Sequence, residues 1–276
     1  MKSGRPRLLN NRTERLIIIK SKCHPRATAR TLMQDINLNG VVSVDTVKRV
    51  LRRGELFGRI AVKKPFLSKK NKKKRFRWCK ERISWTQTDW NKIVFSDESK
   101  IELHPRRREY IRRKPGQALN GNMIQSTRKF SPSLMVWGAI RSDGTRVICR
   151  CEGNVDQYAY QEILEQNLGR IVTGRYVFQQ DGATCHTARS TKEYMTRKRI
   201  RLLPEWPPQS PDLSLIEHIW EILKAKVAAR NGLEELWEVV KDEWEKISND
   251  QIAALYKSMI SRIKAVVLTR GSNTKY

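Results

Sequence analysis

Apolar positions recur with helical spacing three times within the first 53 residues. These patterns predict helices at residues 11–22, 25–36 and 43–53. Each stretch has a residue typical of a helix entrance: Asn11 or Thr13, Pro25, and Ser43. In the third helix, Val44, Val47, Val50 and Leu51 mark an apolar face, while Thr46, Lys48, Arg49, Arg52 and Arg53 cover the rest. A small three-helix domain with a basic last helix is therefore expected.

From residue 77 onward the pattern changes to short apolar runs of strand length that alternate with helical stretches. Strands are predicted at 92–97, 99–103, 108–113, 133–142, 145–153, 175–181 and 200–203. Helices are predicted at 75–92, 156–172, 186–199 and from about Leu213 onward. Hairpins followed by alternating helices and strands predict an α/β domain, in which a mixed sheet carries helices on its faces.

Net charge narrows the class of partner. The chain carries +28 in 276 residues, too much for a metabolic enzyme of small substrates. Residues 1–90 hold 25 lysines and arginines against 6 aspartates and glutamates, a net +19. This asymmetry favours a polyanion that contacts the N-terminal region first, although a ribosomal or merely nuclear-targeted basic protein has similar charge.

Two N-terminal segments are candidates for DNA binding. The basic third helix suits a helix-turn-helix, whose last helix enters the major groove, but a small bundle with a solvated basic face fits the same pattern. Gly4, Arg5, Pro6 and Arg7 resemble an AT-hook, in which two arginines reach into a narrow minor groove. A solvated basic tail is the alternative for that segment.

Residues 54–76 are interpreted as a linker, because Gly54, Gly58 and Pro65 interrupt the pattern before a lysine run from Lys69 to Lys74. The run suits a nuclear localisation signal, a strap that follows phosphates, or a plain solvated linker. Five scattered cysteines and no apolar run of membrane-spanning length indicate an intracellular protein without disulfides, a zinc site or a membrane partner. The expected organisation is an arm at 1–10, a helix-turn-helix at 11–53, the linker and an α/β domain at 77–276.

Three acidic residues occupy comparable places in the predicted α/β domain. Asp97 ends the first strand, Asp181 ends a later strand, and Glu217 lies in the first turn of a helix. If the two strands are neighbours, their carboxylates meet at one sheet edge, and the helix can bring Glu217 beside them. Oxygen ligands without a histidine cluster suit Mg²⁺ or Mn²⁺, and two such ions roughly 4 Å apart assist phosphoryl transfer. We expect Asp181 to have no counter-charge other than metal and phosphate.

Two of these acids also have a purely structural interpretation. Asp181 begins an Asp-Gly sequence typical of turns, and Ser214 with Glu217 fits a capping box. His186 suits a contact to a phosphate or carboxylate, or local bonds at a helix end. Asp212 and His218 are interpreted as structural.

Taken together, the motifs resemble those of Tc/mariner transposases. The resemblance rests on "VFSDES" at 94–99, "FQQDGATCHTA" at 178–188 and "WPPQSPDLSLIEHIW" at 206–220, and it extends to "GRPR" and the following helices. It implies an RNase H-like domain that uses Asp97, Asp181 and Glu217 with two Mg²⁺ ions, or Mn²⁺ as a substitute, to cut element ends and join them to TA target sites. It also implies a homodimer on double-stranded DNA in the nucleus.

Three departures from the family pattern matter. The chain begins near "GRPR", where a further helix-turn-helix usually precedes it. The interval from Asp181 to Glu217 holds 35 residues instead of 34, and "DLSLIEH" lacks the proline usual at that helix entrance. These departures leave a catalytically inactive, truncated DNA-binding protein as an alternative, and an RNase H-like nuclease acting on RNA or hybrids is a second.

Overall fold

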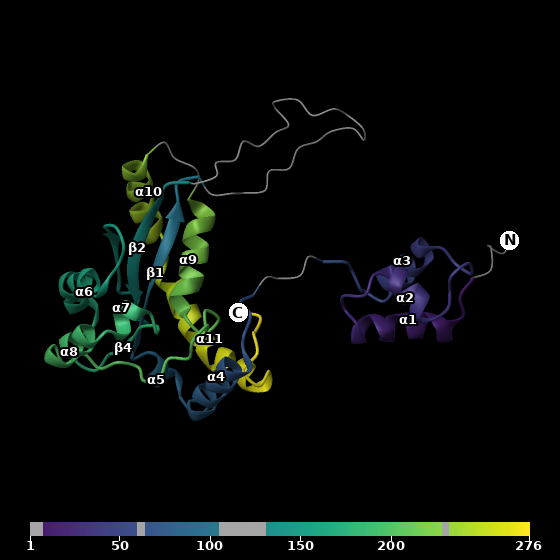
Figure 1. Ribbon diagram of the computed structural model, residues 1–276, viewed down its shortest axis with the longest axis horizontal. Helices are drawn as coiled ribbons and strands as arrows, with labels where there is room; N and C mark the ends of the chain where they lie inside the picture. Colours follow the sequence, from purple (N-terminus) through teal and green to yellow (C-terminus); the bar gives the residue numbers. More distant parts are fainter. Residues whose placement is uncertain (1–7, 60–63, 105–130, 228–231) are drawn as a thin grey trace. The chain divides into compact units, whose positions relative to one another are not determined.

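The computed structural model describes residues 8–59, 64–104, 131–227 and 232–276 (Figure 1). The chain divides into two compact units, Met1–Lys63 and Lys64–Tyr276. The AT-hook-like residues Gly4 to Arg7 and the expected strand at 108–113 lie outside the described residues. No helix within the described ranges is long and apolar enough to cross a membrane.

The first unit consists of three helices, as the pattern predicted: α1 (Asn11–Cys23), α2 (Ala29–Asp35) and α3 (Val44–Arg53). The expected cap at Ser43 is confirmed, since its side chain accepts a hydrogen bond from the Thr46 backbone. The expected entrances at Asn11 or Thr13 and at Pro25 are wrong. Asn10 and Thr28 cap α1 and α2 instead, because their side chains accept hydrogen bonds from backbone N–H groups three residues ahead.

Buried aliphatic side chains from all three helices and their connections hold the first unit together. Val47 and Val50 of α3 pack with Ile17 of α1, and Leu9, Leu38 and Val42 complete this core. The predicted apolar face of α3 therefore points inward. The charged residues of the helix remain on the outside.

A mixed four-stranded sheet forms the centre of the second unit. Its order is β3 (Arg146–Cys151), β2 (Ser133–Ile140), β1 (Ile93–Glu102) and β4 (Val177–Gln179). β1 runs antiparallel to β2 and parallel to β4, and β2 runs antiparallel to β3. The predictions of separate strands at 92–97 and 99–103 are wrong, since β1 pairs with β2 without interruption. The expected strand at 200–203 is reduced to a single bridge between Leu202 and Phe178.

Helices cover both faces of the sheet, which confirms the expected α/β architecture. Along β2, Leu134, Val136 and Ile140 belong to the larger core, whereas Trp137 and Ala139 alternate with them and belong to the smaller one. The larger core contains α9 (Leu215–Lys226), α10 (Leu233–Glu245) and α11 (Asn249–Leu268). The smaller core contains α6 (Gln157–Ile171) and α8 (Arg189–Arg197).

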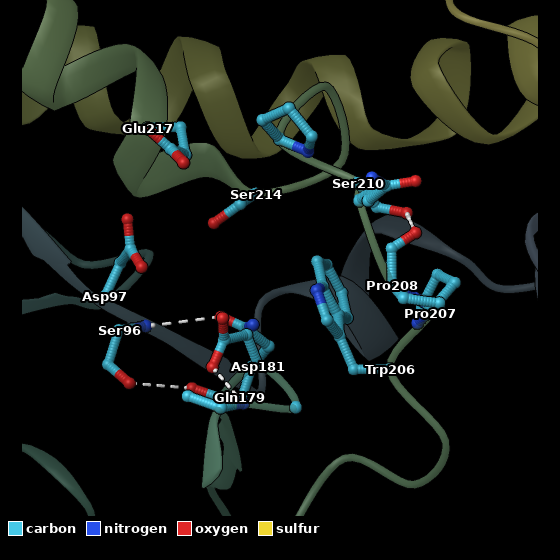
Figure 2. Close-up of a pocket in the computed structure, with 14 residues that line it drawn as sticks. Ser96, Asp97, Gln179, Asp181, Trp206, Pro207, Pro208, Ser210, Ser214 and Glu217 are labelled. Atoms are coloured by element: carbon cyan, nitrogen blue, oxygen red, sulfur yellow. Dashed lines mark hydrogen bonds between the residues drawn. The ribbon is translucent and has the colours of Figure 1, made fainter. Parts of the chain in front are cut away.

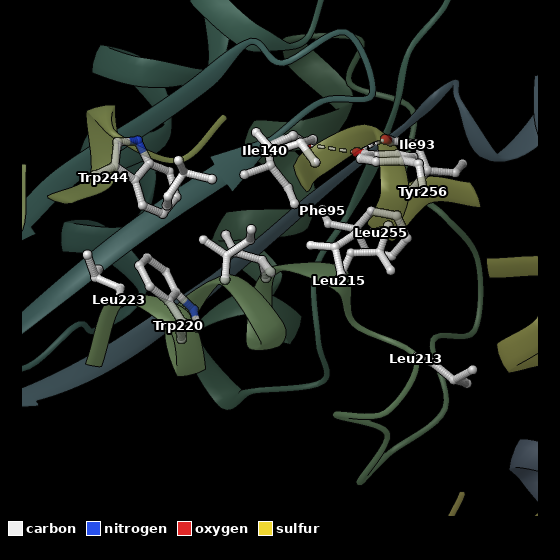
Figure 3. Close-up of a cluster of buried hydrophobic side chains, with 14 of the residues drawn as sticks. Ile93, Phe95, Ile140, Leu213, Leu215, Trp220, Leu223, Trp244, Leu255 and Tyr256 are labelled. Carbon is white, nitrogen blue, oxygen red and sulfur yellow. Dashed lines mark hydrogen bonds between the residues drawn. The ribbon is translucent and has the colours of Figure 1, made fainter. Parts of the chain in front are cut away.

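The larger core is dense in aromatic rings. Trp220 of α9 packs against Trp244 of α10 with ring centroids 5.3 Å apart (Figure 3). The Tyr256 hydroxyl of α11 lies within hydrogen-bonding distance of two carbonyl oxygens, at 2.8 Å from Ile93 and 3.0 Å from Ile140. These contacts join α9, α10 and α11 to the central strands and so fix the position of α9 over the sheet.

Two helix predictions need correction. The lysine run assigned to the linker is the first half of α4 (Lys69–Glu81), which begins at Lys69 because the Ser68 side chain caps it and Arg75 and Trp78 are buried. A separate short helix, α5 (Gln87–Trp90), follows it. The single helix expected at 186–199 is divided into α7 (Thr184–Thr187) and α8, because Ala188 between them is not helical (φ −55°, ψ 148°).

Candidate active site

The register of two neighbouring strands places Asp97 and Asp181 at the same edge of the sheet. β1 and β4 are parallel, and Phe95 lies opposite Gln179. Asp97 and Asp181 each follow two residues later, so both acids lie the same distance beyond the last β1–β4 pair. The prediction that Asp97 ends its strand is wrong, since β1 continues to Glu102 and Asp97 pairs with β2 in its middle, whereas Asp181 does follow the end of β4. Because Phe95 points into the larger core, Asp97 two residues on emerges on the face that α9 covers. The expected convergence of these strands is confirmed.

Hydrogen bonds fasten the two strands together immediately before the acids. The Ser96 hydroxyl donates to the Gln179 carbonyl oxygen at 2.8 Å, and the Ser96 backbone N–H donates to the Gln179 side-chain carbonyl at 3.3 Å (Figure 2). Both residues are buried. These bonds replace the ladder where β4 ends, and so they limit the movement of Asp181 relative to Asp97.

A glycine in the sheet lets α9 come close enough to present Glu217. Gly138 of β2 lies directly opposite Asp97. A Cβ atom on Gly138 would lie 2.7 Å from Cη2 of Trp220, closer than carbon atoms can pack, so glycine leaves the space that this ring occupies. Trp220 follows Glu217 by three residues on the same side of α9. Seating the indole on Gly138 therefore brings Glu217 toward Asp97.

Asp97, Asp181 and Glu217 line one cleft of about 400 Å³, together with Ser96, Gln179 and residues 206–211 (Figure 2). Glu217 lies in the first turn of α9. The extra residue between Asp181 and Glu217 is therefore accommodated before α9 begins. The alternative interpretation of Glu217 as part of a capping box is wrong, since Ser214 makes no side-chain capping bond. The Glu217 carboxylate faces the cleft instead.

The electrostatics of the cleft are those of crowded carboxylates. Burial and the negative charges of Glu217, Glu98 and Asp181 raise the pKa of Asp97 to about 8. Burial likewise raises the pKa of Glu217. Both groups are thus poorly stabilised as anions by the protein alone. A group of carboxylates whose pKa values are raised at a cleft is typical of a functional site.

Asp181 does have a counter-charge within the protein, contrary to expectation. His186 of α7 lies with Nδ1 2.7 Å from Asp181 Oδ1 and Nε2 3.2 Å from Glu98 Oε1. Burial lowers the pKa of His186, but its hydrogen bonds to Asp181 and Glu98 outweigh this effect and raise the pKa to about 10. The charged ring in turn lowers the pKa of Asp181. The alternative of purely local bonds for His186 is therefore wrong.

The contacts of His186 also fix the orientation of the Asp181 carboxylate. Oδ1 accepts hydrogen bonds from the imidazole and from the Ala183 backbone N–H at 2.9 Å. The ring itself is only 3% exposed and packs on Tyr160, with ring centroids 4.1 Å apart. Sequence reasoning missed this network because Glu98 and His186 are 88 residues apart. The one signal in the sequence was the position of His186, five residues after Asp181 in the motif at 178–188.

The donor chemistry of the cleft fits a hard divalent cation, since all three acids offer carboxylate oxygens. The pKa values of Asp97 and Glu217 are raised, and a bound cation would stabilise the charged form of both carboxylates. Within the described ranges, however, no three acidic, histidine or cysteine side chains are grouped closely enough to hold one ion. The residues thus fit a cation in chemistry, while a closed set of ligands is absent from the part of the chain that the structure describes.

Asp212 is structural, as interpreted, but its role is more extensive than a turn. Its carboxylate receives two hydrogen bonds from the Arg75 guanidinium, at 2.7 and 2.8 Å, and both side chains are buried. Arg75 also donates to the Ser210 hydroxyl and to the Gly271 carbonyl oxygen. This pair attaches α4 and the C-terminal residues to the segment that forms one wall of the cleft.

The DNA-binding candidates of α3 are exposed with one exception. Lys48, Arg49, Arg52 and Arg53 are exposed, and Thr46 is half-buried. Lys48 pairs with Asp45 at 3.0 Å, Arg49 donates to the Thr46 hydroxyl, and Arg53 pairs with Glu14 of α1 at 2.7 Å. Arg53 therefore has a structural contact between helices in addition to any contact with DNA.

Two family models match most of the chain. The model described as "DDE superfamily endonuclease" matches residues 92–236, which include all three acids of the cleft. A helix-turn-helix model described as "Transposase" matches residues 14–84. The first match alone covers more than half of the sequence.

Curated relatives match along their full length. The chain is 35% identical over 274 residues to the transposable element Tcb1 transposase of Caenorhabditis briggsae, and 33% identical over 273 residues to the Tcb2 transposase of the same organism. Each match covers 95% of this chain and 100% of the relative. The absence of a further N-terminal helix-turn-helix stays a prediction.

Solved structures of low sequence identity share the fold. A pre-cleavage Mos1 transpososome is matched with a TM-score of 0.82 at 17% identity, over 100% of this chain and 82% of the other. The Mos1 paired-end complex with Mg is matched with a TM-score of 0.81 at 18% identity, with the same coverage of both chains. These matches confirm an RNase H-like mixed sheet preceded by a helix-turn-helix region.

Proposed function

The chain belongs to the Tc1/mariner family of transposases, and we propose that it catalyses metal-dependent phosphodiester hydrolysis at transposon ends and strand transfer into TA target DNA. The convergence of Asp97, Asp181 and Glu217 from three elements on one cleft is the observation that carries this proposal. Each acid comes from a different element, so a shared cleft requires the whole fold.

In this proposal the three carboxylates hold two Mg²⁺ ions, or Mn²⁺ in their place. When bound, the metal polarises the scissile phosphate and lowers the pKa of the attacking water or 3′-hydroxyl. Ser96 and Gln179 keep Asp97 and Asp181 at the same edge of the sheet. His186 holds Oδ1 of Asp181 and so determines which way the carboxylate turns. Trp220 seats α9 and thereby positions Glu217.

The same proposal assigns the partners. Double-stranded DNA of the terminal repeats is the substrate, and exposed cations on α3 support its recognition by the first unit. A solved Mos1 relative is described as a paired-end complex, which supports a homodimer that joins two ends. Because chromosomal DNA is both source and target, we place the protein in the nucleus.

The test is nicking of a supercoiled plasmid that carries candidate element ends, with Mg²⁺, Mn²⁺ or EDTA. Asp181→Asn and Glu217→Gln are expected to abolish nicking while leaving DNA binding unchanged. The matched control is Glu221→Gln, which makes the same chemical change one turn further along α9 at an exposed side chain. It is expected to nick like the wild type.

The outcomes separate the proposal from the two alternatives. Metal-dependent nicking that Glu217→Gln loses and Glu221→Gln keeps supports the catalytic assignment. Salt-sensitive DNA binding without nicking under any metal condition would identify an inactive DNA-binding protein. A preference for RNA–DNA hybrids over duplex DNA would identify a nuclease of a different substrate class.

A further inference from the structure

One side of α4 carries a row of exposed cations. Lys69, Lys70, Lys73, Lys74 and Lys80 are all exposed and recur at spacings that place them on one side of the helix. We call these five lysines the basic face. Within the described ranges, none of them forms an ion pair with the protein, whereas Arg77 beside them pairs with Glu81 and Glu205. The basic face therefore presents charge that no acidic side chain of the described residues neutralises.

The opposite side of α4 is fixed to the segment that lines the acidic cleft. Asn71 donates to the Gln209 side chain at 2.8 Å, and the Trp78 indole donates to the Pro204 carbonyl oxygen at 3.0 Å. Arg75, between them in the helix, makes the buried pair with Asp212. These contacts prevent α4 from turning relative to the cleft. The charges of the basic face consequently have a defined position beside it.

The basic face and the acidic cleft share a wall. A second cavity, of about 300 Å³, is lined by Lys74, Arg77 and Trp78 of α4, by Glu205, which pairs with Arg77, and by Trp206, Pro207 and Pro208. The last three residues also line the acidic cleft (Figure 2). A polymer that occupies the cleft with one phosphate can therefore continue across this wall to Lys74.

We propose that the basic face binds the sugar-phosphate backbone of duplex DNA next to the phosphodiester that occupies the acidic cleft. The inference rests on the proposed function and adds a surface that holds the substrate. Without bound metal, the carboxylates of the cleft repel a DNA strand, and cations beside them offset this repulsion. The residues from Lys69 to Lys80 span about 16 Å of helix, which corresponds to roughly five base pairs of duplex rise. Lysines contact phosphates as point charges, so the surface is expected to bind without sequence preference.

The test compares two triple variants of the full chain that change net charge equally. Lys70→Gln/Lys73→Gln/Lys74→Gln removes part of the basic face. Lys192→Gln/Lys246→Gln/Lys257→Gln removes three exposed lysines from α8, the end of α10 and α11. Binding to a labelled 30-base-pair duplex of arbitrary sequence is measured in EDTA across a series of salt concentrations. All six side chains are exposed, and the one ion pair lost among the described residues, Lys246 with Glu243 at 2.7 Å, is a surface pair that contributes little to stability. Thermal unfolding should therefore be nearly alike in the two variants.

Counterion release sets the expected result. Loss of three phosphate contacts lowers the slope of log affinity against log salt by about 2.7 in magnitude. We expect this change in the basic-face variant relative to the control variant, with weaker binding at low salt. Equal slopes in the two variants would overturn the proposal.

The same experiment keeps this inference separate from the proposed function. Binding is measured in EDTA, so the slopes do not depend on cleavage. If the wild type never nicks DNA but the slopes differ, the catalytic assignment fails and the basic face stands. If the wild type nicks and the slopes agree, the basic face is refuted and the catalytic assignment stands.

Discussion

Binding of Mg²⁺ to the acidic cleft should release a proton at neutral pH. Asp97 has a pKa of about 8, because it is buried and surrounded by the charges of Glu217, Glu98 and Asp181. A metal ligand must be deprotonated, so a cation can bind only after the Asp97 proton leaves. Asp181 and His186 are not expected to release a proton near pH 7, since the pKa of Asp181 is lowered and that of His186 is raised to about 10. Glu217, whose pKa burial raises, adds to the release where it is still protonated.

The magnitude follows from the distance between pH and pKa. With a pKa of about 8, Asp97 is protonated in about 90% of molecules at pH 7 and in about 10% at pH 9. Binding should therefore release about 0.9 proton at pH 7 and about 0.1 at pH 9. Apparent Mg²⁺ affinity should rise close to tenfold per pH unit below pH 7 and level off above pH 8.

Isothermal titration calorimetry in two buffers of different ionisation enthalpy measures the number of protons released. Asp97→Asn should bind Mg²⁺ more weakly and release far fewer protons, and Glu221→Gln should behave like the wild type.

The pH dependence of folding stability gives a second readout. The pKa of Asp97 is about 8 in the folded state and near 3.8 in the unfolded chain, so the folded state favours the protonated side chain. Its contribution to the free energy of unfolding is therefore fully present below pH 4 and is lost as the pH rises toward 8. A wild-type release below about 0.2 proton at pH 7 would refute the reasoning.

Three further substitutions test how the fold positions the cleft. Gly138→Ala puts a Cβ 2.7 Å from the Trp220 ring. We expect urea unfolding to show a free energy of unfolding lower by about 1–3 kcal/mol, and the nicking rate should fall. Adding Trp220→Phe to the same chain should recover part of the stability and part of the nicking. Arg75→Met leaves the Asp212 carboxylate buried without the guanidinium that pairs with it. Thermal unfolding should show a free energy of unfolding lower by about 3–5 kcal/mol, or a Tm lower by roughly 6–20 °C. The control Arg77→Met, at an exposed side chain, should change the free energy of unfolding by less than about 0.5 kcal/mol. His186→Ala removes the hydrogen bond that orients the Asp181 carboxylate. The nicking rate should fall about 10- to 100-fold, while DNA binding stays unchanged. The control His218→Ala, at an exposed side chain, should leave the nicking rate unchanged.

The elements that could be predicted are those determined by local pattern. The apolar run at 133–142 indicated a strand, and the apolar face of α3 indicated a helix that packs by Val47 and Val50. Asp97 and Asp181 were found because each follows a short apolar run. The pattern placed Asp181 correctly just after a strand, but Asp97 lies within β1 because pairing with β2 continues the strand beyond it. The β1 to β4 register brings the two acids together.

The features that were missed depend on partners far away in the sequence. The segment before Arg75 resembled a solvated linker because glycines and a proline precede a run of lysines. The acceptors of Arg75, Ser210 and Gly271, are 135 and 196 residues distant. Ser214 and Glu217 matched a capping box, but Ser214 makes no side-chain capping bond and Glu217 lines the cleft instead. An isolated glycine in the strand pattern at Gly138 was the one available signal of close packing.

The geometry of the cleft depends on the larger core as much as on the three acids. Glu217 reaches Asp97 only if α9 lies close to β2, and that approach requires the absence of a side chain at Gly138. Trp244 of α10 and Tyr256 of α11 then hold α9 and the strands in place from within the same core. A substitution in this core that leaves all three acids intact should therefore lower cleavage before it abolishes folding. Loss of activity in a relative that keeps its acids can on this basis originate far from the site of chemistry.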